Sequence, residues 1–273
     1  MEPIPAHPLA RPRPVRPAEI HPTAVVDPAA QLGHNVRIGP YCVIGPDVTV
    51  GPDCVLDSNV LLTGNVVLGR NNHLYHGAVL GTPPQDLKYK QERSWVEVGN
   101  DNIIREYATI HLATGEDERT RVGDGNMLMT YVHIAHNCHI HNQVIIGGGS
   151  GLAGHVEVED HAIIGGMTPV HQFVRIGQHS FVGGGSRLPQ DVPPFFRVAG
   201  NPVEVAGINA VGLRRRGFPD QELLNIKKAY RLIYRSGLNV TQALERIAQE
   251  CELTPSIEDL MAFIRRSERG IVR

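Results

Sequence analysis

Aromatic residues are scarce in this sequence, since only 5% of its 273 residues are Phe, Trp or Tyr. Glycine and proline are plentiful instead, with 29 and 20 residues. This balance disfavours a core of bulky rings and favours a turn-rich β architecture. The net charge is only −2, so the composition indicates no nucleic-acid partner.

The sequence also has no apolar run of transmembrane length and no CxxC pair. We therefore expect no membrane insertion, and we interpret Cys42, Cys54, Cys138 and Cys251 as reduced thiols of a cytoplasmic protein. Residues 1–19 contain six prolines but no apolar stretch of signal-peptide length. They are predicted to form a flexible, extended and solvated tail.

Aliphatic residues recur at every sixth position between Ile20 and Leu188. Of the 29 positions in this series, 26 are Ile, Val or Leu, and the exceptions are Asp86, Glu92 and Glu116. An amphipathic helix cannot keep this period, because 3.6 residues per turn would rotate the stripe away. Period six fits one short strand and one corner. Three such hexads make an 18-residue triangular coil, whose apolar side chains are buried by the coils next to it. We predict an all-β parallel β-helix of about ten coils over residues 20–202.

Two polar stretches interrupt the aliphatic series, at residues 81–95 and 113–120. We predict that both leave the prism as loops, and loops on a rigid scaffold often carry function. After residue 202 the apolar spacing becomes helical, which predicts a small C-terminal α-helical domain over residues 203–273. Its excess of Lys and Arg indicates either a docking surface for an acidic partner or ordinary solvated helix faces.

Residues 18 apart are stacked neighbours in such a prism. His136 is therefore next to Gly154, and Gly154 is next to Gln172. A histidine beside a residue without a side chain forms a candidate pair of general base and backbone oxyanion donor. The residues that flank this column are also polar: His133, Asn137, His155 and His171.

Six glycines form two adjacent columns over three consecutive coils. The columns are Gly147, Gly165 and Gly183, followed by Gly148, Gly166 and Gly184. One interpretation is that hexad corners favour glycine for left-handed backbone angles. The other is a groove, bare of side chains, for an extended chain.

The histidine-rich segment 133–141 has a composition that is common in metal sites. The spacing argues against a local site, because His133 should point outward from its strand and His136 lies toward a corner. A zinc site would need ligands from a neighbouring subunit, and simple surface histidines are an alternative. We predict no metal site.

Several motifs narrow the hexapeptide pattern to one family. They are QDLKY (85–89), HIAHNC (133–138), IIGGMTPVHQF (163–173), LRRRGF (213–218) and RSERGIVR (266–273). Together they resemble the UDP-N-acetylglucosamine O-acyltransferases, which are left-handed β-helix enzymes of the hexapeptide-repeat acyltransferase superfamily. The resemblance covers residues 20–273.

The resemblance implies a cytoplasmic homotrimer with active sites between adjacent subunits. The implied reaction moves an (R)-3-hydroxyacyl chain from acyl carrier protein to the 3-hydroxyl of UDP-N-acetylglucosamine, the first step of lipid A synthesis. His136 would be the general base, and the Gly154 N–H would stabilise the oxyanion. Transfer would be direct, without a cofactor or an acyl-enzyme, so no Ser or Cys nucleophile is expected.

Further residues match the family's substrate contacts. Gly184 matches the position that bounds acyl length, and glycine there predicts a long hydroxyacyl chain. Lys88 and the arginines are fixed cations suited to phosphate or carrier-protein contacts. The implied contacts are Asp86, Lys88, His133, His155, His171, Gln172, Asn209, Arg215 and Arg216.

The sequence departs from the family pattern at four places. Asn137 replaces the usual Asp after the catalytic His, and Val211 replaces a Glu that contacts the nucleotide. Residues 111–114 read HLAT instead of HRGT, and residues 147–149 read GGG instead of a more Asn-rich stretch. An acceptor with an amine at sugar position 3 is therefore an alternative.

Other enzymes of the superfamily give competing hypotheses. The related N-acyltransferase of the same pathway has an extra N-terminal domain, whereas about 19 residues precede the repeats here. A coenzyme A-dependent acetyltransferase fits the basic helical end and the glycine columns less well. A zinc carbonic anhydrase or a catalytically silent scaffold is the remaining alternative.

Overall fold

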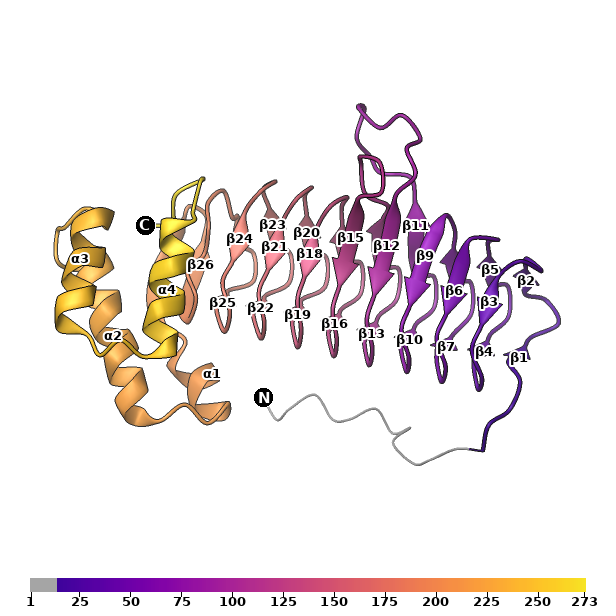
Figure 1. Cartoon of the computed structure of the whole chain (residues 1–273), viewed down its shortest axis with the longest axis horizontal. Coiled ribbons are helices and arrows are strands. Elements are labelled where there is room, and N and C mark those ends of the chain that lie inside the picture. Colours follow the sequence, from indigo (N-terminus) through magenta and orange to yellow (C-terminus); the bar gives the residue numbers. More distant parts are fainter. Residues whose placement is uncertain (1–13) are drawn as a thin grey trace.

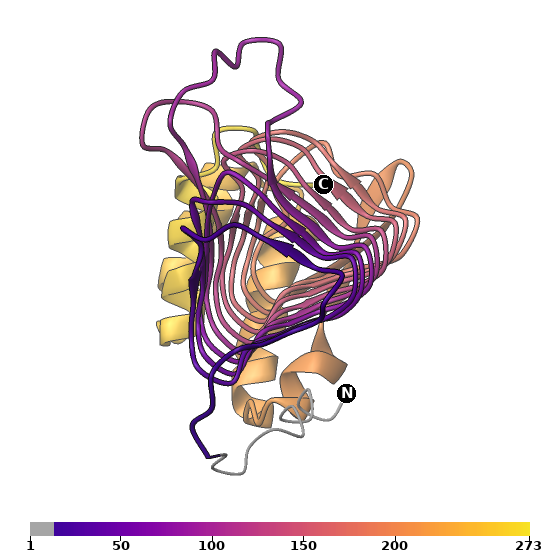
Figure 2. The same cartoon turned by 90° about the vertical axis from the view of Figure 1, so that its right-hand side faces the viewer.

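The computed structural model describes residues 14–273 and shows a three-sided parallel β-helix followed by helices (Figure 1). The view down the long axis shows the chain winding around three flat faces (Figure 2). The predicted tail falls, for residues 1–13, outside the described residues. Each face of the prism is one β-sheet.

The three sheets are called A, B and C, in the order in which each coil visits them. Sheet A contains β1 (Glu19–Ile20), β4 (Arg37–Ile38), β7 (Val55–Leu56), β10 (His73–Leu74), β13 (Ile103–Ile104), β16 (Met127–Leu128), β19 (Ile145–Ile146), β22 (Ile163–Ile164), β25 (Phe181–Val182), β26 (Phe196–Gly200) and β27 (Val203–Ile208). Sheet B contains β2 (Val25–Val26), β5 (Val43–Ile44), β8 (Leu61–Leu62), β11 (Val79–Thr82), β14 (Thr109–His111), β17 (His133–Ile134), β20 (Gly151–Leu152) and β23 (Pro169–Val170). Sheet C contains β3 (Gln31–Leu32), β6 (Val48–Val50), β9 (Asn65–Leu68), β12 (Trp95–Val98), β15 (Arg119–Val122), β18 (His139–Ile140), β21 (Glu157–Val158) and β24 (Arg175–Ile176).

The aliphatic series supplies the core, as the sequence predicts. Leu62, Leu80 and Ile134 are completely buried, and each is stacked on the aliphatic residue of the next coil. At the corners the chain turns through left-handed backbone angles, as at Asn35 (φ 58°) and Asp53 (φ 60°). Asn and Asp tolerate this conformation better than other residues with a side chain.

The cysteines of the prism have packing roles. Cys42, Cys54 and Cys138 are fully buried, and each thiol donates a hydrogen bond to a backbone carbonyl of the next coil. Burial raises the pKa of the Cys54 thiol to about 11 and that of Cys138 to about 12. These thiols are therefore neutral and unreactive near pH 7.

Two excursions leave the prism at one corner. Stacked residues in ordinary coils are 18 apart, as for Val43 and Leu61, but Asn65 pairs with Trp95 and Trp95 with Arg119. The extra residues form the loops between β11 and β12 and between β14 and β15. Both loops project from the corner between sheets B and C, called the B/C corner (Figure 2).

A hairpin and four helices close the C-terminal end of the prism. β26 pairs antiparallel with β27, so sheet A continues to Ile208, past the boundary predicted at residue 202. The helices are α1 (Ala210–Arg215), α2 (Asp220–Tyr234), α3 (Val240–Glu250) and α4 (Pro255–Arg265). They share a second hydrophobic core, which includes Phe195 and Phe196.

Helix α2 buries one face, which includes Leu223, Ile226 and Ile233 at helical spacing. Helix α1 was not predicted from the sequence. Among the helices within residues 14–273, none combines the length and apolarity needed to cross a membrane.

Candidate active site

The B/C corner brings His136 and Gly154 together. His133 pairs with Gly151 in adjacent strands, so the residues three positions later are stacked neighbours at the corner. The imidazole of His136 lies over the Gly154 backbone so closely that a Cβ at Gly154 would be 2.5 Å from Nε2. A side chain at Gly154 would therefore displace the His136 ring. The His136 side chain is only 15% exposed, which shields it from bulk water.

Asn137 fixes the tautomer of His136. The Thr114 N–H donates to Asn137 Oδ1 (3.0 Å), and Asn137 Nδ2 donates to the Thr114 carbonyl (3.1 Å). A backbone N–H only donates and a carbonyl only accepts, so the orientation of the amide is determined. Oδ1 also lies 2.9 Å from His136 Nδ1, which must therefore carry a proton and donate it. The lone pair of the neutral ring is then on Nε2, the atom beside Gly154.

The N–H of Gly154 is available as a hydrogen-bond donor. The neighbouring N–H groups of Ala153 and His155 donate to the carbonyls of Val170 and His136. No partner for the Gly154 N–H is found among residues 14–273. An unpaired backbone donor beside a histidine with a free lone pair can stabilise negative charge that develops on a bound carbonyl oxygen.

The loop between β11 and β12 brings Asp86 to this corner. Asp86 Oδ2 lies 3.8 Å from His136 Nε2, which is too long for a hydrogen bond but close enough for an ion pair when the ring is protonated. Its other oxygen accepts a hydrogen bond from the Lys88 N–H (2.9 Å). The Lys88 side chain is exposed, so its ammonium is free to meet an anionic group.

His133 lies in β17, three residues before His136 in the same coil. Its Nδ1 is 2.8 Å from the Thr109 hydroxyl, and its ring meets His111 edge to face at 4.9 Å. Burial lowers the pKa of His133. Burial, followed by the charges of His133 and His136, lowers the pKa of His111 to about 4. Both rings are therefore neutral near pH 7, and His133 serves as an uncharged hydrogen-bonding group.

His155 forms the next part of the site wall. Its ring stacks on Phe173 at 4.6 Å and meets His136 edge to face at 5.2 Å. Burial, then the nearby His136, lowers its pKa. His171 and Gln172 follow in the next coil of the same corner, and both side chains are exposed.

Asn209, Arg215 and Arg216 lie at a different corner. Asn209 caps α1 and donates through Nδ2 to the carbonyl of His179, which follows β24 at the corner between sheets C and A. Arg215 and Arg216 are at the end of α1 and are exposed. Within one chain, these three residues are therefore not gathered around His136.

Gly184 lies at the third corner, between sheets A and B. All six glycines of the two columns have backbone angles outside the left-handed region, so that explanation is wrong for them. A Cβ at Gly165 would collide with the backbone of Gly184, so coil stacking requires glycine in the first column. A Cβ at Gly184 would lie no closer than 3.2 Å to another atom, the Gly166 carbonyl oxygen, so stacking restricts this position less.

The chain resembles known proteins over almost its whole length. A family model described as UDP-N-acetylglucosamine O-acyltransferase, domain 2, matches residues 191–272, and bacterial transferase hexapeptide repeats match residues 17–52 and 119–154. The acyl-[acyl-carrier-protein]–UDP-N-acetylglucosamine O-acyltransferase of Thermodesulfovibrio yellowstonii is 45% identical, covering 93% of this chain and 99% of the relative. The enzyme of the same name from Paraburkholderia phytofirmans is 48% identical, covering 94% and 100%.

Solved structures show the same relationship. The UDP-N-acetylglucosamine acyltransferase of Bacteroides fragilis superimposes with a TM-score of 0.91 at 42% identity, covering 93% of this chain and all of the other. This chain belongs to the UDP-N-acetylglucosamine O-acyltransferase family. The relationship confirms two sequence-based predictions, the left-handed parallel β-helix and acyltransferase activity.

Two residues of this UDP-N-acetylglucosamine O-acyltransferase family member contribute to the site but escaped sequence analysis. Thr114 holds Asn137, and His111 packs against His133. A constant spacing of 18 between stacked residues does not place Thr114 or His111 near these partners. The excursion after β14 raises the spacing to 24 between Thr109 and His133. The available signal in the sequence was that two places depart from the family pattern together, residues 111–114 (HLAT) and Asn137.

Proposed function

We propose that this chain transfers an (R)-3-hydroxyacyl group from acyl carrier protein to the 3-hydroxyl of UDP-N-acetylglucosamine, the first step of lipid A synthesis. Relatives that match nearly the full chain carry an acyl-carrier-protein donor and UDP-N-acetylglucosamine in their names. The observation that carries the proposal is the placement of His136 Nε2, with its lone pair, beside the unpaired Gly154 N–H.

In the proposed reaction, His136 Nε2 takes the proton of the sugar hydroxyl. The sugar oxygen attacks the thioester carbonyl, and the Gly154 N–H stabilises the oxyanion that forms. Collapse of this intermediate breaks the C–S bond and forms the ester. The imidazolium returns its proton to the leaving thiolate of the carrier protein. No cofactor is required.

The distribution over three corners supports a site shared between subunits. His136, Asn209 and Gly184 each lie at a different corner of the same prism, so no single chain gathers them. In a homotrimer, one corner of each subunit can face another corner of its neighbour. We propose that His136 of one subunit works with the nucleotide and acyl contacts of the next, in a cytoplasmic trimer.

The test is acyl transfer from a panel of (R)-3-hydroxyacyl-carrier proteins to UDP-N-acetylglucosamine and to its 3-amino analogue. We expect transfer to the hydroxyl acceptor, and a loss of at least about a hundredfold in kcat for His136→Ala with assembly unchanged. His34→Ala is the matched control, because this exposed histidine is remote from the corner. Transfer to the amine alone would replace the proposed acceptor. Full activity of His136→Ala would reject the proposed base.

A further inference from the structure

Three potential metal ligands project from sheet C outside the candidate active site. His139 and His141 alternate with buried Ile140 in β18 and just beyond it, so both side chains point outward. Glu157 of β21 pairs directly with His139 in the next coil and points to the same side. Their ligand atoms all lie within 4.8 Å of one another.

The pair formed by His141 and Glu157 already has the spacing of two metal ligands. Around tetrahedral Zn²⁺, with bonds of about 2.0–2.2 Å, neighbouring nitrogen and oxygen ligands are about 3.3 Å apart. His141 Nε2 and Glu157 Oε1 are 3.2 Å apart. His139 stacks on the ring of His141 at 4.1 Å and is exposed, so a rotation of its side chain can bring in the third ligand.

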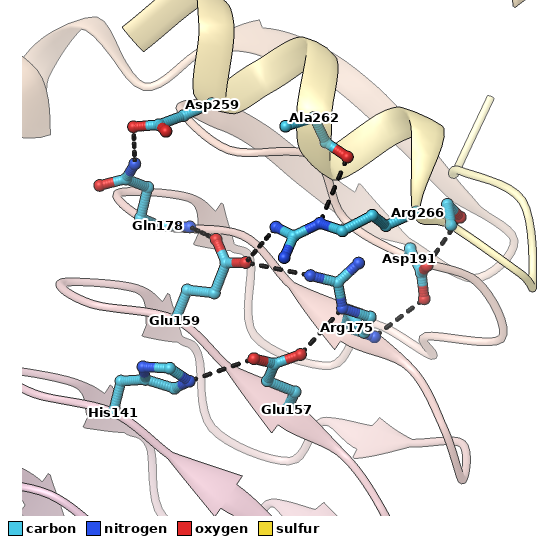
Figure 3. A network of polar contacts seen from close by, with 10 residues as sticks. His141, Glu157, Glu159, Arg175, Gln178, Asp191, Asp259, Ala262 and Arg266 are labelled. Atoms are coloured by element: carbon cyan, nitrogen blue, oxygen red, sulfur yellow. Dashed lines mark hydrogen bonds and ion pairs between the residues drawn. The ribbon is translucent and has the colours of Figure 1, made fainter. Parts of the chain in front are cut away.

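Contacts with residues around the three potential ligands hold Glu157 in position (Figure 3). Arg175 donates from Nε to Glu157 Oε2 (2.9 Å), on the oxygen that does not face His141. Arg175 is in turn held by Glu159 and lies over the ring of Phe263 in α4. Hydrogen bonds from outer residues to a ligating carboxylate are typical of metal sites, because they fix the orientation of the ligand.

The surrounding charges do not oppose a cation. Arg175 pairs with Glu157 and Glu159, and Arg121, the other nearby arginine, shares Glu97 with Arg119. The carboxylate of Asp160 adds negative charge near both histidines.

Against the sequence-based prediction of no metal site, we propose that His139, His141 and Glu157 bind a divalent transition-metal ion of the zinc type. Two imidazole nitrogens and one carboxylate oxygen are ligands that suit Zn²⁺ and Co²⁺ better than Mg²⁺ or Ca²⁺. The ion connects β18 to β21, two neighbouring coils, and water completes its coordination. This site is distinct from the B/C corner, because its ligands project from the face of sheet C.

The proposal is tested by equilibrium dialysis of the full chain against Zn²⁺ and by the visible absorption of the Co²⁺ form. We expect one ion per chain in the wild type. His139→Ala and His141→Ala should each lose the ion at a free zinc concentration that saturates the wild type, and Glu157→Gln should weaken binding. Thermal unfolding should shift upward with Zn²⁺ in the wild type and not in His139→Ala or His141→Ala.

His136→Ala is the decisive control, since the histidines of the B/C corner could also attract zinc. It should retain the ion and its Co²⁺ spectrum, and acyl transfer should survive in His139→Ala. Loss of the ion in His136→Ala with retention in His139→Ala would overturn the proposal, as would no stoichiometric binding by the wild type. The readout is metal content, so this result is independent of the acyl-transfer test.

Discussion

At the scale of single residues, a neutral amide stands where a carboxylate is usual in the family. Asn137 accepts from His136 Nδ1 as a carboxylate would, but its Nδ2 also donates to the Thr114 carbonyl. It thereby connects the base to the loop between β14 and β15. The amide orients the ring without adding negative charge beside it, so the imidazolium of the proposed mechanism would receive less electrostatic support than it would beside a carboxylate.

Asn137→Asp should therefore change the pH dependence of the reaction. A carboxylate beside Nδ1 stabilises the imidazolium, so the acidic limb of the kcat/KM profile should move to higher pH by about one unit. Thr114→Val is the matched control, because it removes a hydroxyl near Nδ1 (3.4 Å) without changing the charge. A profile of Asn137→Asp that coincides with the wild type would show that Asn137 does not govern the proton affinity of the base.

At the scale of elements, the sequence predicted the repeating unit well and the corners poorly. Period six identified the buried positions, such as Leu62 and Ile134, because burial repeats with every strand. It did not show that His136, Asn209 and Gly184 occupy three different corners, since a hexad has the same pattern on every face. The contact between Thr114 and Asn137 depends on how an irregular loop returns, and periodicity carries no information about that path.

The second glycine column gives a prediction at this scale. Gly184→Met should shift donor preference toward shorter acyl chains, because a side chain would fill the exposed strip at the corner between sheets A and B. Gly184→Ala should have a smaller effect in the same direction, since its Cβ needs only a slight displacement of the Gly166 carbonyl. The readout is relative kcat/KM over a series of donors. The same donor preference in all three proteins would show that the acyl chain does not bind at this corner.

At the scale of the whole molecule, the three-sided prism separates groups that the proposed reaction requires together. His136 and Gly154 share one corner, whereas Arg215 and Arg216 are near another. In the proposed trimer, subunit association would be part of forming the active site, and a folded monomer would hold only fragments of it.

Mixed assemblies test this directly. His136→Ala chains and chains with both Arg215→Ala and Arg216→Ala should each be nearly inactive. Co-expressed in equal amounts, they should recover about a quarter of wild-type activity, because that fraction of interfaces unites two intact corners. Pairing His136→Ala with Gly154→Ala should recover nothing, since both changes affect one corner. Equal results for the two pairs would place the site within a single chain.

The antiparallel turn of β27 against β26 also bears on how the protein avoids polymerising. A stack of parallel coils ends in unpaired strand edges, which can template the next molecule and grow into a fibre. The last hairpin reverses the strand direction, and the helices that pack with Phe195 and Phe196 cover this end. A chain shortened to residue 195 would expose the edges of three sheets at once, and we expect it to assemble end to end.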